Sequence, residues 1–217
     1  MLFRSKKDAE TQMLEIQVVD AADSIAYDSH DVDDALKLGL LVPKQLNGLR
    51  LVERAKAYVS SKAPIPLDQM DPHLQRPLLV HSLIDLQMGD FLEYSSKLLR
   101  EIDGMDSWGA RKARVLLRMS PELDEEKKEL ERFLFENVYR HPSLVDVRQR
   151  AATRLRQLYN LLVSHPDRLP DRVITWIKRW GIERSVATYL AGMTDRFCDD
   201  QYLAMVEMRR DKAIDWY

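Results

Sequence analysis

The sequence predicts an all-α protein, and three observations lead to that prediction. Only seven of the 217 residues are glycine, and few segments show the alternation of apolar and polar residues that marks a half-buried strand. Leu, Ala, Arg and Glu, which favour helices, are abundant. Apolar residues recur at spacings of three and four, as they do along the buried stripe of a helix. We therefore expect a helical bundle without a sheet.

Composition places the chain among ordinary globular proteins. It is 45% hydrophobic and 31% charged, which is enough to build one compact domain or two closely packed halves. A formal charge of −2 gives no general attraction to nucleic acid or to an anionic membrane. The single Cys198 excludes an intrachain disulfide and a thiolate zinc cluster within the chain. No segment has the apolar length of a signal peptide or a membrane span, so we expect a soluble, cytoplasmic protein.

Start and stop signals delimit helices in the first half of the chain. The first expected helix carries an apolar stripe of Leu14, Val18, Ala21, Ala22, Ile25, Ala26 and Val32. Gly39 and Pro43 interrupt the pattern, and a second helix is expected over 45–61. A long helix follows over about 72–101, and then a loop over 104–109. The pattern of 110–119 does not fix its structure.

Prolines delimit the helices of the second half. Ser120 is expected to cap a helix that has Pro121 at its first position, and Pro142 is expected to start the next one. Gly181 should end a third. The expected helices are 121–139, 142–163, one that contains Trp176 and Trp180, and 183–210 with Gly192 as its only interruption.

The most informative polar pattern lies on the first helix, where Asp23, Tyr27 and Asp31 are spaced four residues apart. Steps of four drift by only about 40° on a helix, so these side chains form one row roughly 12 Å long. We call it the polar row. A row of this length matches the reach of a metal-bound nucleotide.

An acidic surface is the competing interpretation of the same segment. Six aspartates lie within fifteen positions: Asp20, Asp23, Asp28, Asp31, Asp33 and Asp34. They lower helix propensity and repel one another, and such charge runs usually form a solvated face. The place of Tyr27 inside the row favours a binding site.

Three segments together resemble the HD-domain deoxynucleotide triphosphohydrolases, which are dGTPase-like enzymes that split a dNTP into a deoxynucleoside and triphosphate. The segments are 17–34, 133–144 and 189–197. Their order and separation make the resemblance fairly specific. It implies an all-α helical bundle that corresponds to the C-terminal part of such an enzyme. Residues 1–119 would be the C-terminal portion of the HD-type catalytic helical domain, and residues 120–217 the phosphohydrolase-associated helical domain.

The resemblance also implies roles for the polar row. In this family a His, a His-Asp dyad and a distant Asp hold a divalent metal, and Asp23 is similar to that last ligand. Tyr27 and Asp31 resemble the residues that face the deoxyribose. The chemistry fits these roles: a carboxylate suits Mg²⁺ or Mn²⁺, a phenol ring can pack on a sugar, and Asp31 can accept a hydrogen bond from a 3′-hydroxyl.

Two further motifs carry the resemblance. Arg140 and His141 look like the family's Tyr-Arg-His-Pro turn, where cationic donors could bind the triphosphate. Equally, Arg140 could satisfy helix-terminal carbonyls while His141 packs locally. The segment 193–196 is similar to the family's closing motif, and we expect a structural role for it, as a buried network of Asp195 and Arg196.

The sequence lacks most of the metal site that the resemblance implies. His30-Asp31 is not the expected dyad, because that dyad lies well upstream in a His-Asp-x-Gly-His stretch that is absent here. Three of the four ligands are therefore missing, no catalytic residue is assigned, and we expect the chain alone to be inactive or nearly so. A dNTP and a missing N-terminal half, or copies in a homo-oligomer, are the expected partners.

Several explanations of the missing ligands stay open. We favour a fragment of a longer hydrolase, whose first helix and helix from Pro72 would expose apolar surface and self-associate. Another polypeptide could instead supply the lost half. The rival outside the enzyme class is a non-catalytic helical module that binds a nucleotide or another protein.

Overall fold

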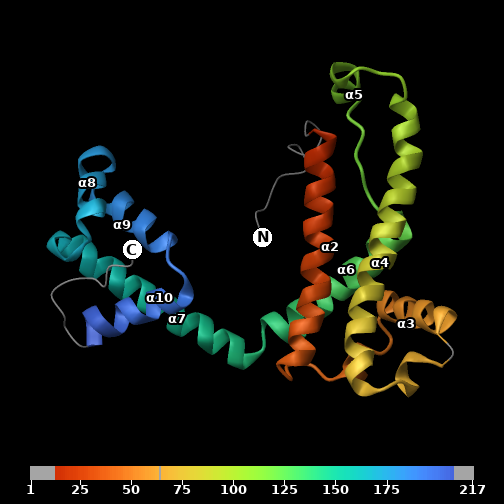
Figure 1. Ribbon diagram of the computed structural model, residues 1–217, viewed down its shortest axis with the longest axis horizontal. Coiled ribbons are helices and arrows are strands. Elements are labelled where there is room, and N and C mark those ends of the chain that lie inside the picture. Colours follow the sequence, from red (N-terminus) through yellow and green to blue (C-terminus); the bar gives the residue numbers. More distant parts are fainter. Residues whose placement is uncertain (1–12, 64, 208–217) are drawn as a thin grey trace. The chain divides into compact units, whose positions relative to one another are not determined.

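The computed structural model describes residues 13–63 and 65–207, and every regular element within them is helical, which confirms the all-α prediction (Figure 1). The α-helices are α2 (Leu14–Lys37), α3 (Arg50–Lys62), α4 (Pro72–Leu99), α5 (Ser107–Ala113), α6 (Pro121–Leu134), α7 (Pro142–Ser164), α8 (Asp171–Trp180), α9 (Ile182–Ala191) and α10 (Asp195–Tyr202). Short 3₁₀ turns are η1 (Pro43–Leu46), η2 (Leu67–Gln69), η3 (Arg100–Ile102) and η5 (Pro166–Arg168), and η4 (Phe135–Tyr139) and η6 (Leu203–Glu207) are π-helical.

The chain forms two compact units, Met1–His141 and Pro142–Tyr217. Helix α6 belongs to the first unit because it packs against α2 and α3. The predicted division between 119 and 120 concerns family domains, and it stays a prediction because a family domain and a packing unit need not end at the same residue.

Helix α4 lies at the centre of the N-terminal unit and contacts both α2 and α3 (Figure 1). The fully buried apolar side chains of this core include Ile25, Val32, Leu46, Leu51, Leu83, Leu123 and Leu130. Burial of one such side chain contributes about 1.5–3 kcal/mol relative to exposure. The apolar stripe predicted on the first helix therefore faces this core through Ile25 and Val32, but its predicted members Val18 and Ala22 are exposed.

Polar contacts fix the position of α2 as well. The ammonium group of Lys127 on α6 pairs with the carboxylate of Asp28, and both side chains are buried. Arg76 on α4 pairs with Asp33. At the other end of α2, the Gln17 side chain donates to the carbonyl of Val115 and accepts from the amide of Leu117, at 3.2 and 2.9 Å. Helix α2 therefore presents a defined face to its neighbours and another to solvent.

The C-terminal unit has its own core, built by α7, α8, α9, α10 and η6. Its buried apolar side chains include Leu158, Leu162, Val173, Val186 and Met205. Gly181, with φ of 77°, ends α8 in a conformation that L-residues rarely adopt, so the predicted stop at Gly181 is confirmed.

The predicted helix over 183–210 is wrong as a single helix. Helix α9 ends at Ala191, and α10 begins at Asp195 after a turn. The cause is Thr194, whose hydroxyl oxygen accepts from the amide of Phe197 at 3.3 Å and so caps a new helix. Residues past 207 lie outside the described part of the chain.

Substitution of this cap gives a first testable prediction. Thr194→Ala is expected to lower the free energy of unfolding by about 1 kcal/mol, because the Phe197 amide loses its acceptor. Thr188→Ala, an exposed change inside α9, is the control and should cost less than about 0.5 kcal/mol. Urea denaturation of the whole chain measures both, and equal losses would contradict the capping role.

Apolar side chains also lie open to solvent on the two long helices of the N-terminal unit. Val19 on α2 is 66% exposed, and Leu74, Met88 and Leu92 on α4 are exposed as well. The expectation of uncovered apolar surface on these helices is confirmed, whereas self-association stays a prediction. Among the described residues, no helix combines the length and the apolar content needed to cross a membrane.

Candidate functional site

The polar row lies on one continuous helix. Because α2 runs unbroken through Leu14–Lys37, Asp23, Tyr27 and Asp31 follow one another at one-turn intervals. Asp23 and Tyr27 are exposed to solvent, with 57% of Tyr27 accessible, whereas Asp31 is half-buried. The row therefore runs from an open end at Asp23 to a more enclosed end at Asp31.

Asp31 is held by a residue far away in the sequence. The hydroxyl of Tyr139, at the end of the π-helical segment η4, donates to Oδ2 of Asp31. Burial of the Asp31 carboxyl raises its pKa to about 6, the nearby Asp34 carboxylate raises it too, and His30 opposes them. Sequence reasoning did not assign Tyr139 to the site. The only signal was its place in the Tyr-Arg-His-Pro segment, since a π-helix and a contact across 108 positions leave no local pattern.

This contact brings the turn that contains Arg140 and His141 to the Asp31 end of the polar row, because both residues directly follow Tyr139. The Arg140 guanidinium lies over the ring of Phe135, 4.7 Å from its centroid. The backbone amide of His141 donates to the carbonyl of Val138 at 2.9 Å. Its Nδ1 is buried and has no hydrogen-bond partner among the described residues.

Two of the six clustered aspartates have structural roles. Asp28 and Asp33 pair with Lys127 and Arg76 on neighbouring helices, so they are not part of a solvated acidic face. Asp23 and Asp34 are exposed. The acidic segment therefore combines residues that position α2 with residues that α2 presents to solvent.

The residues present do not by themselves fit a catalytic metal. Among the described residues, no group of three or more His, Cys, Asp or Glu side chains is placed to hold an ion. Asp23 would contribute one exposed carboxylate, and catalytic divalent metals need several ligands from the protein. No chemical step through a metal is derived from these residues.

The raised pKa of Asp31 predicts a measurable pH dependence. Its pKa in the folded state, about 6, lies above the ordinary value of 3.8. Between pH 3.8 and pH 6 the folded state therefore binds more protons than the unfolded state. The contribution of Asp31 to stability is therefore full below about pH 4 and is lost as pH rises through about 6. NMR titration of the carboxyl carbon should give a midpoint near 6.

Two variants test this titration. Tyr139→Phe should raise the pKa of Asp31 further, because a donor to the carboxylate is removed. Asp31→Asn keeps an acceptor for Tyr139 and removes the titrating group. The stability of this variant relative to the wild type should therefore be higher at pH 7 than at pH 4. An Asp31 midpoint near 4 in the wild-type chain would contradict the described burial.

Comparisons with known proteins identify similar chains. Residues 117–204 match the phosphohydrolase-associated domain. A deoxyguanosinetriphosphate triphosphohydrolase-like protein of Geobacter metallireducens is 34% identical over 196 residues, which are 89% of this chain and 50% of that protein. One from Brucella suis is 32% identical over 222 aligned positions, covering 97% of this chain and 53% of that protein.

The chain therefore spans about half the length of the curated relatives it matches. The match extends over almost all of the chain, and it includes the segments that carry the polar row and the Tyr-Arg-His-Pro turn. The resemblance predicted from three motifs is confirmed: the chain resembles the C-terminal part of deoxyguanosinetriphosphate triphosphohydrolase-like proteins, including their phosphohydrolase-associated domain.

Proposed function

We propose that this chain is the deoxyribose-recognising part of a dNTP triphosphohydrolase whose metal site is completed by residues outside these 217. The observation that carries the proposal is the hydrogen bond from Tyr139 to Asp31, which joins the polar row to the turn with Arg140 and His141. A sugar-facing row and a cationic turn side by side are what recognition of a deoxynucleoside triphosphate requires. A cytoplasmic setting is part of this proposal.

Each residue of the site has a role in this proposal. The Tyr27 ring packs on the deoxyribose, and Asp31 accepts a hydrogen bond from the 3′-hydroxyl. Tight packing of Tyr27 against the sugar leaves no room for a 2′-hydroxyl, and this separates deoxynucleotides from ribonucleotides. Arg140 and His141 donate to phosphate oxygens. Asp23 is one ligand of a divalent ion such as Mg²⁺ or Mn²⁺, which polarises the phosphate and activates water when bound.

The exposed apolar side chains support a missing partner segment. Val19 on α2 and Leu74, Met88 and Leu92 on α4 belong to the two longest helices of the N-terminal unit. If these side chains form one contiguous patch, it has the character of a surface that contacts other protein. In the proposal, the part of the enzyme that corresponds to the other half of the relatives covers them and supplies the remaining metal ligands. The 217 residues alone are then inactive or nearly so.

A non-catalytic module that binds a nucleotide or another protein is the second candidate. The exposure of Asp23 and Tyr27 favours it, because an open face on α2 can serve as a docking surface without any metal. The two candidates differ in their selectivity for the sugar. Only the deoxyribose-recognising site distinguishes dGTP from GTP at Tyr27 and Asp31.

Nucleotide binding by the chain tests the proposal without requiring catalysis. Titration with dGTP should shift the amide NMR signals of Tyr27 and Asp31, GTP should bind more weakly, and Tyr27→Ala should abolish the difference. Tyr58→Ala on α3 is the matched control, because Tyr58 contacts Lys62 on its own helix and lies outside the row. Equal binding of GTP and dGTP would refute the sugar-recognising role and leave the interaction module.

A further inference from the structure

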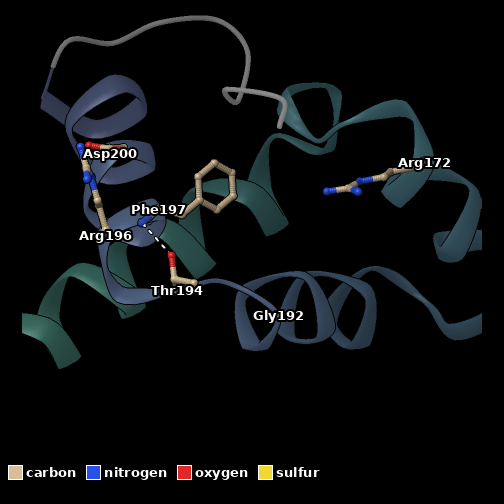
Figure 2. Close-up of a pocket in the computed structure, with 6 residues that line it drawn as sticks. All are labelled: Arg172, Gly192, Thr194, Arg196, Phe197 and Asp200. Carbon is tan, nitrogen blue, oxygen red and sulfur yellow. Dashed lines mark hydrogen bonds between the residues drawn. The ribbon is translucent and has the colours of Figure 1, made fainter. Parts of the chain in front are cut away.

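The expected structural role of the closing motif, 193–196, is contradicted. Asp195 and Arg196 are both exposed, so they do not form the predicted buried network. The reason is the cap at Thr194, which makes them the first two residues of α10. Arg196 lines a cavity of about 440 Å³ together with Arg172 of α8, but Figure 2 shows the two side chains on opposite sides of the Phe197 ring. These cations therefore do not converge on one ligand.

Cations do converge at the corner between α8 and α9 in the same unit (Figure 1). The Arg179 guanidinium lies over the ring of Trp180, 5.8 Å from its centroid. The Arg184 guanidinium, from α9, lies 6.0 Å from the same centroid. Two helices thus bring two cations to one aromatic side chain. We call Arg179, Trp180 and Arg184 the corner site.

Local structure holds the Trp180 ring in place. Gly181, with its φ of 77°, turns the chain from α8 into α9, and the two helices pack against each other. Trp176, one turn earlier on α8, contacts Trp180 at a centroid distance of 5.7 Å and is partly buried against the core of the unit. Trp180 itself is 37% exposed. The ring is therefore anchored on one side and open to a partner on another.

The cations of the corner site are not neutralised by carboxylates of the described residues. Arg154 in the same unit shows the contrast, because its guanidinium pairs with Asp199 at 2.6 Å. Arg184 is the third residue of α9, where the positive end of the helix dipole disfavours a cation. Helix stability therefore does not explain its position. Arg179 and Arg184 would both gain from an anionic partner.

The surroundings favour a protein segment over a nucleic acid as that partner. Exposed carboxylates, Asp171 and Glu183, lie on the same two helices. A nucleic-acid strand carries a phosphate at every nucleotide and would meet these carboxylates, whereas a protein can place neutral or basic groups beside them. Arg179 and Arg184 also lie over the Trp180 ring, where a base would stack. Trp and Arg are enriched among the residues that dominate binding energy in protein interfaces.

We propose that the corner site docks an acidic segment of another protein. Carboxylates of that segment pair with Arg179 and Arg184, whose planar guanidiniums can each donate two parallel hydrogen bonds. An apolar side chain of the segment packs on the exposed part of Trp180. The corner site takes no part in the proposed hydrolysis, and the inference stands whether or not the chain recognises dNTPs.

The probe is a synthetic peptide of four Glu-Leu repeats, titrated into the full chain while the indole N–H signal of Trp180 is followed by NMR. We expect a saturable shift, and none with the matching Gln-Leu peptide, which lacks the carboxylates. Arg179→Ala and Arg184→Ala should each weaken binding about tenfold, because each removes charge-assisted hydrogen bonds. Arg179→Lys should also weaken binding, since it keeps the charge but loses the planar fork.

Lys178→Ala is the matched control. Lys178 is an exposed cation of the same helix, and positions two residues apart on a helix point about 200° apart, so its side chain is directed away from that of Trp180. Its loss should leave binding unchanged. A loss of affinity as large as that of Arg179→Ala would mean diffuse charge attraction and would overturn the site. Absence of a saturable shift with the Glu-Leu peptide would also overturn it.

Two further measurements separate other occupants of the corner site. Oligothymidylate should shift the Trp180 signal more weakly than the Glu-Leu peptide does, and tighter binding would refute the protein partner in favour of a single-stranded nucleic acid. Sedimentation of the chain should not change on Arg179→Ala. If this substitution instead abolished self-association, a second copy of the chain would be the occupant, and the proposal of a different acidic protein would be overturned.

Discussion

Asp23→Ala is expected to reduce triphosphate release from dGTP by at least about 100-fold in a joined protein, because the proposed metal loses a ligand. This joined protein links the 217 residues to the N-terminal half of the Geobacter metallireducens relative. A bound metal supplies several kcal/mol of transition-state stabilisation, and each 1.36 kcal/mol is a factor of ten. The rate of triphosphate release at saturating Mn²⁺ measures the effect.

Glu15→Ala is the control for this substitution. Glu15 is another exposed carboxylate of α2, but it lies outside the polar row. Its replacement should change the rate less than about threefold, on the scale of a surface substitution. If both variants lost activity equally, the effect would reflect the general negative charge of α2, and the role of Asp23 as a ligand would be refuted.

Lys127→Ala is expected to lower the free energy of unfolding by about 3–5 kcal/mol. Lys127 and Asp28 are only 6% and 7% exposed, so loss of the ammonium group leaves a buried carboxylate without its counterion. Lys127 also donates to Glu131 at 2.7 Å. Burial lowers the pKa of Lys127, and the Glu131 carboxylate opposes that shift.

The neighbouring Lys128 provides the control. It pairs with Asp124 and Glu125 on the surface of the same helix, at 2.7 and 2.9 Å. Exposed pairs of this kind contribute about 0–1 kcal/mol, so Lys128→Ala should cost little. Urea denaturation compares the two variants, and a cost for Lys127→Ala no greater than that for Lys128→Ala would rule out a structural role for the buried pair. The double substitution Asp28→Asn with Lys127→Met should recover most of the loss, because neither charge then remains buried.

Local signals explain why so much of the fold could be predicted. Ser120 starts a helix and Gly181 ends one through contacts within a single turn, so both boundaries could be predicted from the sequence. The break before Thr194 was missed because Gly192 and a threonine are both tolerated inside a helix, and only packing decides between a cap and a continuation. The start of α3 at Arg50, later than predicted, follows from the 3₁₀ turn at Pro43–Leu46.

The candidate site could be predicted only in part, for a related reason. The polar row follows from helical spacing, which depends on α2 alone. The contact between Asp31 and Tyr139, and the pairing of Asp28 and Asp33 with other helices, depend on tertiary packing across many residues. The structure leaves both Asp23 and Tyr27 exposed, and helical spacing alone does not predict whether a side chain is enclosed.

Triphosphate release from dGTP with Mn²⁺, measured for the 217-residue chain and for the joined protein, tests the central claim most directly. The proposal predicts no release from the chain alone and release from the joined protein that Asp23→Ala abolishes. Hydrolysis by the chain alone would contradict the claim that its metal site is incomplete. A folded joined protein that binds dGTP without releasing triphosphate would contradict the claim that this chain is part of a dNTP triphosphohydrolase.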